Sequence, residues 1–156
     1  MNTKDLRKIY RKMASELEDD EIRLRLDRIT EAIPEKKYQM AYRFSIVLHP
    51  CVVVGVCSLR VGTIDELYYA GHIGYGIHEA YRGHHYASKA CVLLFKLARA
   101  VGLSEVIITC NPENIASRKT MERVGCVYIE HVLLPEDHEM YRLGERSKLI
   151  YKKSLL

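Results

Sequence analysis

A short basic turn near the middle of the chain has the residue types that could bind a phosphate group. It consists of Arg82, Gly83, His84, His85, Tyr86 and Ala87. An apolar segment of strand length, 72–77, precedes the turn, and an apolar stripe at helical spacing, 87–101, follows it. A strand, a tight turn and a buried helix together present unpaired backbone N–H groups and the positive end of the helix dipole at one place. The sequence therefore predicts an anion-binding turn at the start of this helix.

A second polar cluster follows the next apolar segment. The run 105–110 has the length and composition of a buried strand, and Asn111 after it is typical of a residue that caps the start of a helix. Gly125 is placed to end that helix. Asn114 and Ser117 are three residues apart, so they share one helix face. A strand-helix-strand crossover of this kind favours a parallel pair of strands.

The two landmarks, in this order and spacing, resemble those of the GNAT superfamily of N-acyltransferases. Residues 81–87 resemble the acyl-CoA pyrophosphate loop of that family, and 111–117 with 123–126 resemble its next strand-to-helix crossing. The closest likeness is to the branch that acetylates the N-termini of ribosomal proteins. The resemblance is clearest over 52–152 and weak before that.

The resemblance implies that acetyl-CoA is the acyl donor. The turn at 82–87 would hold its pyrophosphate, and the preceding strand would pair with its pantetheine through backbone groups. Those strand residues are Tyr75, Gly76 and Ile77. One of their N–H groups would bind the thioester oxygen. In the branch that this chain resembles, residues at the positions of Asn114 and Ser117 contact pantetheine, and the serine protonates the leaving thiolate.

Two positions depart from the family pattern. His85 stands where the family usually has its second loop glycine, which lets the backbone approach the pyrophosphate. Either the loop tolerates this side chain and the imidazole helps to bind phosphate, which we favour, or the site is altered. Met121 stands where many GNAT proteins place a tyrosine as the general acid, so this chain cannot use that tyrosine.

The reaction benefits from a general base, because the attacking amine must be neutral. An alkylammonium with a pKa of about 10.4 is almost wholly protonated at pH 7. His72 is the first candidate, since related sequences often carry Glu at the equivalent place; the alternative is an ordinary strand histidine. Glu66 and Glu79 are lesser candidates. Cys110 could be imagined as an acyl-carrying nucleophile, but no positive partner is visible to lower its pKa, and direct attack by the amine is favoured.

The rest of the chain supplies the elements that must position these residues. Alternation and helical spacing predict a helix at 5–17, a strand at 23–29, a hairpin of strands at 42–48 and 52–61, and closing strands at 127–134 and 148–155. We expect one domain, residues 1–156, of the α/β class. The resemblance implies a mixed central sheet, with two central parallel strands that splay apart and helices on both faces.

Composition excludes several classes of protein. With 48% hydrophobic and 28% charged residues, the chain is typical of a globular protein. It has no membrane-spanning apolar run and no signal peptide, so we expect a cytoplasmic protein. Its five cysteines are scattered and odd in number, which favours reduced thiols over a zinc site or disulfides. A net charge of +4 suits a polyanionic ligand such as CoA as well as a nucleic acid.

The sequence therefore predicts an N-acetyltransferase that moves an acetyl group from acetyl-CoA to a primary amine by direct attack in a ternary complex. The alternative is a non-catalytic CoA-binding protein on the same fold. A nucleic-acid-binding module that uses the basic N-terminal helix is disfavoured, because no groove-reading motif is present. The resemblance implies that the acceptor, a small molecule or a peptide, binds at the segments least like the family, which are 20–45, 62–71 and 135–146. The oligomeric state stays open, a dimer included, and no metal site is expected.

Overall fold

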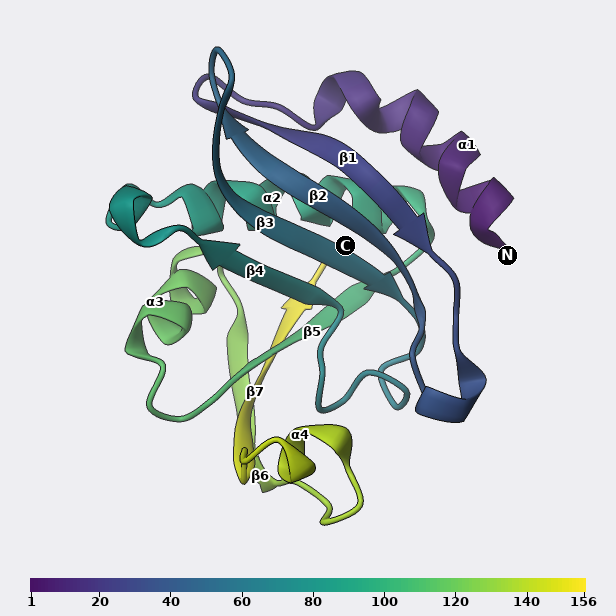
Figure 1. The fold of residues 1–156 in the computed structure, drawn as a ribbon, viewed down its shortest axis with the longest axis vertical. Helices are drawn as coiled ribbons and strands as arrows, with labels where there is room; N and C mark the ends of the chain where they lie inside the picture. The colour runs from purple at the N-terminus through teal and green to yellow at the C-terminus, as the bar shows by residue number, and fades with distance from the viewer.

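The computed structural model describes all residues, 1–156, as two sheets with helices packed between and beside them (Figure 1). The helices are α1 (Thr3–Met13), α2 (Tyr86–Ala100), α3 (Ile115–Arg123) and α4 (Glu139–Arg142). The strands are β1 (Ile22–Thr30), β2 (Met40–Leu48), β3 (Val52–Val61), β4 (Ile73–Ile77), β5 (Glu105–Cys110), β6 (Val127–Leu133) and β7 (Ser147–Ser154). Short 3₁₀ turns lie at Ala14–Glu16, Pro34–Lys36 and Glu79–Tyr81.

The strands form two antiparallel sheets rather than one mixed sheet. The first has the order β1-β2-β3-β4 and the second the order β5-β7-β6. The predicted hairpin is the pair β2 and β3, joined at His49-Pro50. The α/β class is confirmed, while the predicted single sheet is divided at its centre.

The division lies between β4 and β5, the facing edge strands of the two sheets. At one end, the amide of His72 donates to the carbonyl of Ile107 at 2.7 Å. Beyond that point no backbone hydrogen bond joins β4 to β5. The two strands that the resemblance predicts to splay apart are therefore held together at one end and separate along the rest of their length.

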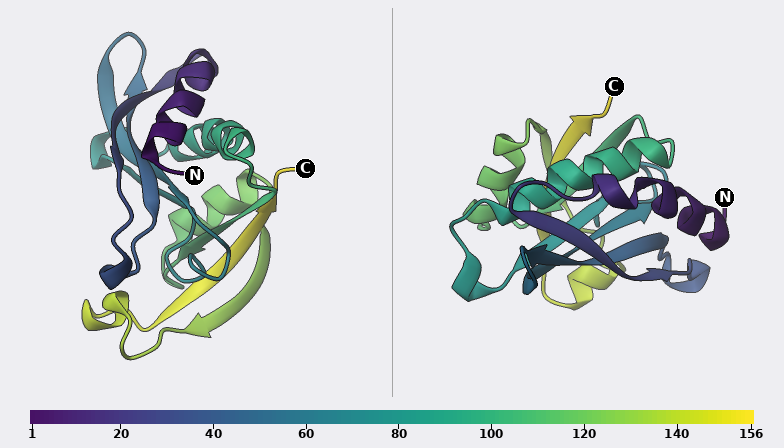
Figure 2. Two further views of the ribbon diagram at one scale, coloured as in Figure 1. Left: turned by 90° about the vertical axis from the view of Figure 1, so that its right-hand side faces the viewer. Right: turned by 90° about the horizontal axis from the view of Figure 1, so that it is seen from above.

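Helices α1 and α2 pack on the same face of the first sheet, as both views in Figure 2 show. Their apolar sides and that face of the sheet join β5, α3 and β7 in one core of 29 buried residues, which includes Leu6, Tyr42 and Leu94. The Tyr42 hydroxyl donates to the carbonyl of Leu6 at 2.5 Å and fastens α1 to the sheet. The opposite face of β1–β4 carries no helix, although helices were expected on both faces. None of the helices is both long enough and apolar enough to cross a membrane.

Glycines end α2 and α3 as predicted, and the start of α3 differs from the prediction. Gly102 and Gly125 have φ values of +95° and +82°, a backbone region that favours glycine. The N-cap of α3 is Asn114 and not Asn111, because the Asn114 side chain accepts a hydrogen bond from the amide of Ser117 at 3.0 Å. Helix α3 is therefore three residues shorter at its start than the sequence indicates.

Candidate active site

The turn before α2 exposes a run of six backbone amides. The amides from Gly83 to Ser88 donate to no backbone or side-chain acceptor in the protein, and the N-cap residue His85 makes no side-chain capping bond. The first turn of a helix always leaves such donors, and a helix dipole adds partial positive charge there. Here the loop residues Gly83 and His84 extend the run beyond the helix itself. The arrangement can bind a group with several anionic oxygens.

His85 occupies a backbone conformation that favours glycine. Its φ and ψ are 64° and 22°, in the left-handed region, and Gly83 nearby has a φ of +88°. An L-residue held there stores about 1–2 kcal/mol of strain. This explains physically why a glycine suits the position. Strain of this kind is typical of functional sites, where the surrounding structure maintains it.

The side chains of the turn divide into one anchor and two exposed groups. Tyr86 is buried, and the ring of His84 stacks on it with 5.4 Å between ring centroids. Arg82 is exposed, and its Nε donates to the carbonyl of Ile77 at 3.2 Å, which ties the turn to the end of β4. This bond leaves the Nη groups of Arg82 free to meet an anion beside the amides. Ala87 is half-buried in the first turn of α2.

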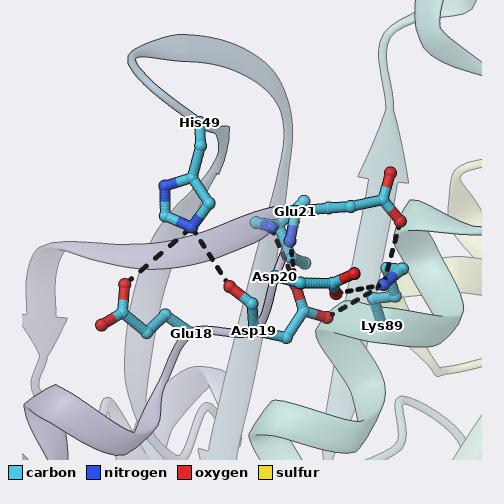
Figure 3. Close-up of polar contacts among 7 residues, drawn as sticks. Glu18, Asp19, Asp20, Glu21, His49 and Lys89 are labelled. Atoms are coloured by element: carbon cyan, nitrogen blue, oxygen red, sulfur yellow. Dashed lines mark hydrogen bonds and ion pairs between the residues drawn. The ribbon is translucent and has the colours of Figure 1, made fainter.

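Close to this turn, Lys89 partly offsets the negative charge of an acidic segment. Figure 3 shows its Nζ among three carboxylates, at 3.3 Å from Asp19, 3.2 Å from Asp20 and 3.0 Å from Glu21. Burial acts to raise the pKa of Asp19, but hydrogen bonds from the Ile22 and Glu21 amides and from Lys89 outweigh it and lower that pKa. The cluster also fastens the segment before β1 to the first turns of α2.

The open edge of β4 presents backbone donors to the gap between the sheets. In an antiparallel pair, alternate residues bond to the neighbouring strand. The His72 carbonyl accepts from Arg60, and the His78 amide donates to Val54, so Gly76, at the same alternation, bonds to β3. The amides of Tyr75 and Ile77 consequently face away from β3, toward β5. Of the three strand residues singled out in the sequence, two can offer an amide to a ligand in the gap.

His72 is enclosed, and the prediction that it is the general base does not fit its contacts. The residue is 0% exposed; its Nδ1 accepts from the Ile107 amide at 2.9 Å, and its Nε2 lies 3.0 Å from the carbonyl of Gly62. Both ring nitrogens are therefore used, and Nε2 carries the proton. Burial lowers the pKa of His72. The imidazole joins β4 to β5, and no ring nitrogen is left for a substrate proton.

Ser117 and Tyr75 meet across the gap. The Ser117 Oγ lies 2.7 Å from the Tyr75 hydroxyl, which reaches from β4 to the first turn of α3. Burial raises the pKa of Tyr75, while the bond to Ser117 lowers it, and the net shift is upward. The phenol therefore stays protonated. Asn114 is exposed, and its side-chain oxygen is taken up by the cap of α3. Met121 is 0% exposed and belongs to the core.

The Tyr75 hydroxyl is the group that sequence reasoning missed, because only the backbone of this residue was considered. The alternation of side chains along the strand could have indicated the role of this hydroxyl. Tyr75 lies between two glycines in β4, so its side chain is the only one that points to the helix-covered face between Ile73 and Ile77.

The other candidates have ordinary surroundings. Glu66 is exposed, its carboxylate accepts from the Thr63 amide at 3.1 Å, and hydrogen bonding to Thr63 lowers its pKa. Glu79 is exposed in the 3₁₀ turn. Cys110 is buried, and burial raises its pKa although Lys148 and other groups oppose the shift. None of these three is an activated base or nucleophile.

Side chains from three loops contact one another near β4. The Tyr38 hydroxyl, from the β1–β2 connection, donates to the carboxylate of Glu139 at 2.7 Å. The ring of Tyr69, from the β3–β4 connection, lies edge-on to His138 with 5.4 Å between centroids. Segments far apart in the sequence thus form one rim near β4.

Comparison with known proteins identifies the family. Residues 1–127 match the family model described as an acetyltransferase (GNAT) domain. No curated protein matches the chain. Among solved structures, an acetyltransferase of the GNAT family from Bacillus anthracis is 22% identical, with a TM-score of 0.58 over 72% of this chain and 66% of that one.

Two further solved structures have the same fold. The microcin C7 self-immunity acetyltransferase MccE, solved in complex with acetyl-CoA and AMP, is 22% identical, with a TM-score of 0.57 over 78% of this chain and 62% of its own. The acetyltransferase from Salmonella typhimurium that modifies the N-terminal serine of ribosomal protein L7/L12 is 20% identical, with a TM-score of 0.57 over 73% and 63%. The matched regions span roughly two thirds or less of these proteins. Because the family model covers more than half of the sequence, this chain belongs to the GNAT acetyltransferase family.

Proposed function

We propose that this protein is an acetyl-CoA-dependent N-acetyltransferase acting on a primary amine. The observation that carries the proposal is the run of unpaired amides from Gly83 to Ser88 at the mouth of the gap between β4 and β5. A diphosphate fits this run, since each of its oxygens needs a donor and the helix dipole favours negative charge. Family membership and the relative solved with acetyl-CoA support the same donor.

Acetyl-CoA supplies a thioester, whose acyl carbon is open to attack by an amine. The chain holds its diphosphate with the amides of 83–88 and the Nη groups of Arg82. The amides of Tyr75 and Ile77 line the route through the gap and can donate to the pantetheine and to the thioester oxygen. An N–H fixed in a water-poor gap stabilises negative charge on that oxygen as the amine attacks.

Ser117 is placed to deliver the proton that the departing sulfur needs. When the Tyr75 phenol donates to Ser117 Oγ, the serine proton is free to point into the gap. As that proton passes to the sulfur, the phenol proton replaces it on Oγ, and solvent restores the proton of Tyr75. A thiol with a pKa near 8.5 leaves readily, so this acid contributes modestly. The attacking amine loses its proton to solvent, because His72 has no free nitrogen. We therefore expect the rate to rise with pH toward the pKa of the amine.

Thermal unfolding with and without acetyl-CoA tests donor binding. A ligand at 100 times its dissociation constant stabilises a protein by about 2.7 kcal/mol, so a clear rise in melting temperature is expected. Arg82→Glu should reduce that rise, whereas Arg11→Glu, an exposed arginine on α1, should not. An unchanged melting temperature at millimolar acetyl-CoA would contradict the proposal.

The alternative function, a CoA-binding protein without turnover, is motivated by His85 and Met121. Release of free CoA thiol, followed with a thiol-reactive dye across amines and peptides, distinguishes the two functions. Steady thiol release that depends on the amine supports the enzyme. Tight CoA binding with no release from any amine would favour the alternative.

A further inference from the structure

The helix-free face of the first sheet carries an unusual row of polar side chains. The strand register aligns Arg28, Arg43, Ser58 and Gly74 across β1, β2, β3 and β4. Arg60 lies two residues after Ser58, on the same face of β3. This is the face toward the viewer in Figure 1, and Figure 2 shows α1 and α2 on the other side.

These side chains line a cavity that reaches the open edge of β4. Its volume is about 610 Å³, within the usual range for ligand pockets, and Gly74, Tyr75 and Gly76 form one wall. Gly76 and Gly74 place no side chain over this wall. A Cβ at Gly76 would meet nothing within 4 Å, and one at Gly74 would lie 3.6 Å from the nearer Nη of Arg60. The cavity therefore opens directly onto the strand that borders the gap.

The arginines of this cavity have no carboxylate partner. None of Arg28, Arg43 and Arg60 forms an ion pair, although all three line the cavity. The single acidic residue of the lining, Asp27, accepts from Ser45 at 2.7 Å and from Arg25 at 3.4 Å. The excess positive charge is left without a counter-charge from the protein.

Two of these guanidinium groups are also partly desolvated. The Nε of Arg43 is buried and has no hydrogen-bond partner. Arg60 is partly buried and donates once, from Nη1 to the carbonyl of Gly71 at 3.2 Å. Burial, together with the charge of Arg43, lowers the pKa of Arg60. A buried donor and two neighbouring like charges are both unfavourable until an anion pairs with them.

We propose that this cavity binds the acceptor and that the acceptor amine carries an anionic group, a carboxylate or a phosphate, held by Arg43 and Arg60. Guanidinium groups pair with either anion through two parallel hydrogen bonds. With its anionic end on these arginines, the acceptor can extend its amine across Gly74 to the open edge of β4. This inference rests on the proposed function, because it takes the second substrate to be an amine that accepts the acetyl group.

The test compares matched amines that differ in one anionic group. The C-terminal amides of Gly-Asp and Gly-Asn form the carboxylate pair, and phosphoethanolamine and ethanolamine form the phosphate pair. We expect the wild-type protein to bind at least one anionic member about tenfold or more tightly than its neutral partner, by calorimetry in the presence of CoA, and to acetylate it preferentially. The pair that shows the preference identifies whether the site binds a carboxylate or a phosphate.

The variants Arg43→Gln and Arg60→Gln should each reduce the ratio of anionic to neutral binding about tenfold, and Arg43→Lys should restore part of it. Arg7→Gln, on the exposed side of α1, is the matched control and should keep the ratio. An unchanged acetyl-CoA melting shift in each variant shows that the fold is intact. Equal binding of both members in both pairs, or equal losses for anionic and neutral amines in the variants, would overturn the inference.

The proposed function and the proposed anion site can be disproved independently of each other. If acetyl-CoA gives no melting shift while an anionic amine still binds through Arg43 and Arg60, the donor assignment fails and the anion site stands. If acetyl-CoA binds and neutral amines are acetylated as well as anionic ones, the enzyme stands and the anion site fails.

Discussion

The two ends of β4 share one strand and have opposite environments. At the His72 end, the imidazole is buried with both ring nitrogens paired, and the strand is fastened to β5 through Ile107. At the end formed by Tyr75 and Ile77, the strand edge is unpaired, and the amides face a gap. The bonds of His72 join the backbones of the two sheets at one end of β4, and the absence of such bonds along the rest of the strand leaves its edge open to a ligand.

Neighbouring residues of one sequence motif can therefore have two different roles: some fix the shape of the gap, and others take part in the chemistry. A histidine next to a site can shape the gap without touching a substrate, as His72 does. The chemistry at the open end depends on backbone donors and on the hydroxyl pair Tyr75 and Ser117. Substitutions at the closed end should therefore change stability most, and those at the open end should change activity most.

The largest expected effect is at the closed end. His72→Ala removes both ring bonds, leaves the Ile107 amide and the Gly62 carbonyl unpaired, and creates a cavity. We expect a loss of about 3–5 kcal/mol in the free energy of unfolding, measured by urea denaturation. A loss below about 1 kcal/mol would show that β4 and β5 are held together by other contacts.

Because His72 is buried, we also expect the stability of the protein to depend on pH. Burial lowers the pKa of His72 in the folded state, whereas in the unfolded chain it titrates near 6.5. Below pH 6.5 the unfolded chain therefore binds more protons than the folded one, so stability is complete above that pH and falls as pH decreases toward the folded-state pKa. The slope approaches about 1.4 kcal/mol per pH unit. His72→Gln, which does not titrate, should lack this component between pH 7 and 5, and identical slopes would refute it.

Two glycines on the neighbouring strands β3 and β4 give the next effect in size. A Cβ at Gly55 would lie 2.3 Å from the Gly76 carbonyl oxygen, whereas one at Gly76 would meet nothing within 4 Å. We expect Gly55→Ala to push β4 away from β3 and to cost about 2–3 kcal/mol. Gly76→Ala should change stability by less than about 0.5 kcal/mol. Thermal unfolding of both variants tests this, and equal melting temperatures would contradict the close approach.

At the open end, the hydroxyl pair should affect rate more than stability. Ser117→Ala should lower kcat about tenfold to a hundredfold. Tyr75→Phe should lower it less and cost about 1 kcal/mol of stability through its lost hydrogen bond. Thr120→Ala, which removes a hydroxyl bonded within the same helix, is the control. Thiol-release kinetics measure these effects, and normal turnover in Ser117→Ala would exclude the serine as proton donor.

The smallest effect is at the anion-binding turn. His85→Gly relieves left-handed strain of about 1–2 kcal/mol but adds backbone entropy to the unfolded chain, so a net gain of at most about 1 kcal/mol is expected. His85→Ala keeps the strain and should show no gain. If the imidazole helps to bind phosphate, both variants should show a smaller acetyl-CoA melting shift. A full shift in both would assign phosphate binding to the amides and Arg82 alone.

Much of the fold could be predicted because its signals are local. Alternation in 23–29 and in the 42–61 hairpin, the apolar stripe of α2, and the glycines at 102 and 125 correspond to elements of the structure. The start of α3 was misplaced, because Asn111 and Asn114 are both acceptable caps, and a hydrogen bond to Ser117 decides between them. The unpaired amides of the turn before α2 were predicted for the same local reason, because the helix begins without a side-chain cap, and anion binding there stays a prediction.

The sequence by itself determined the order of the elements, the turn that opens α2 and the family resemblance, because these depend on residues that are close along the chain. Only the tertiary structure decided that His72 is enclosed, that Tyr75 meets Ser117, and that Arg43 and Arg60 share a cavity. Each of these depends on which strands become neighbours and on which face each side chain points to. A shift of one residue in strand register reverses that face, so only the assembled sheets determine which side chains meet.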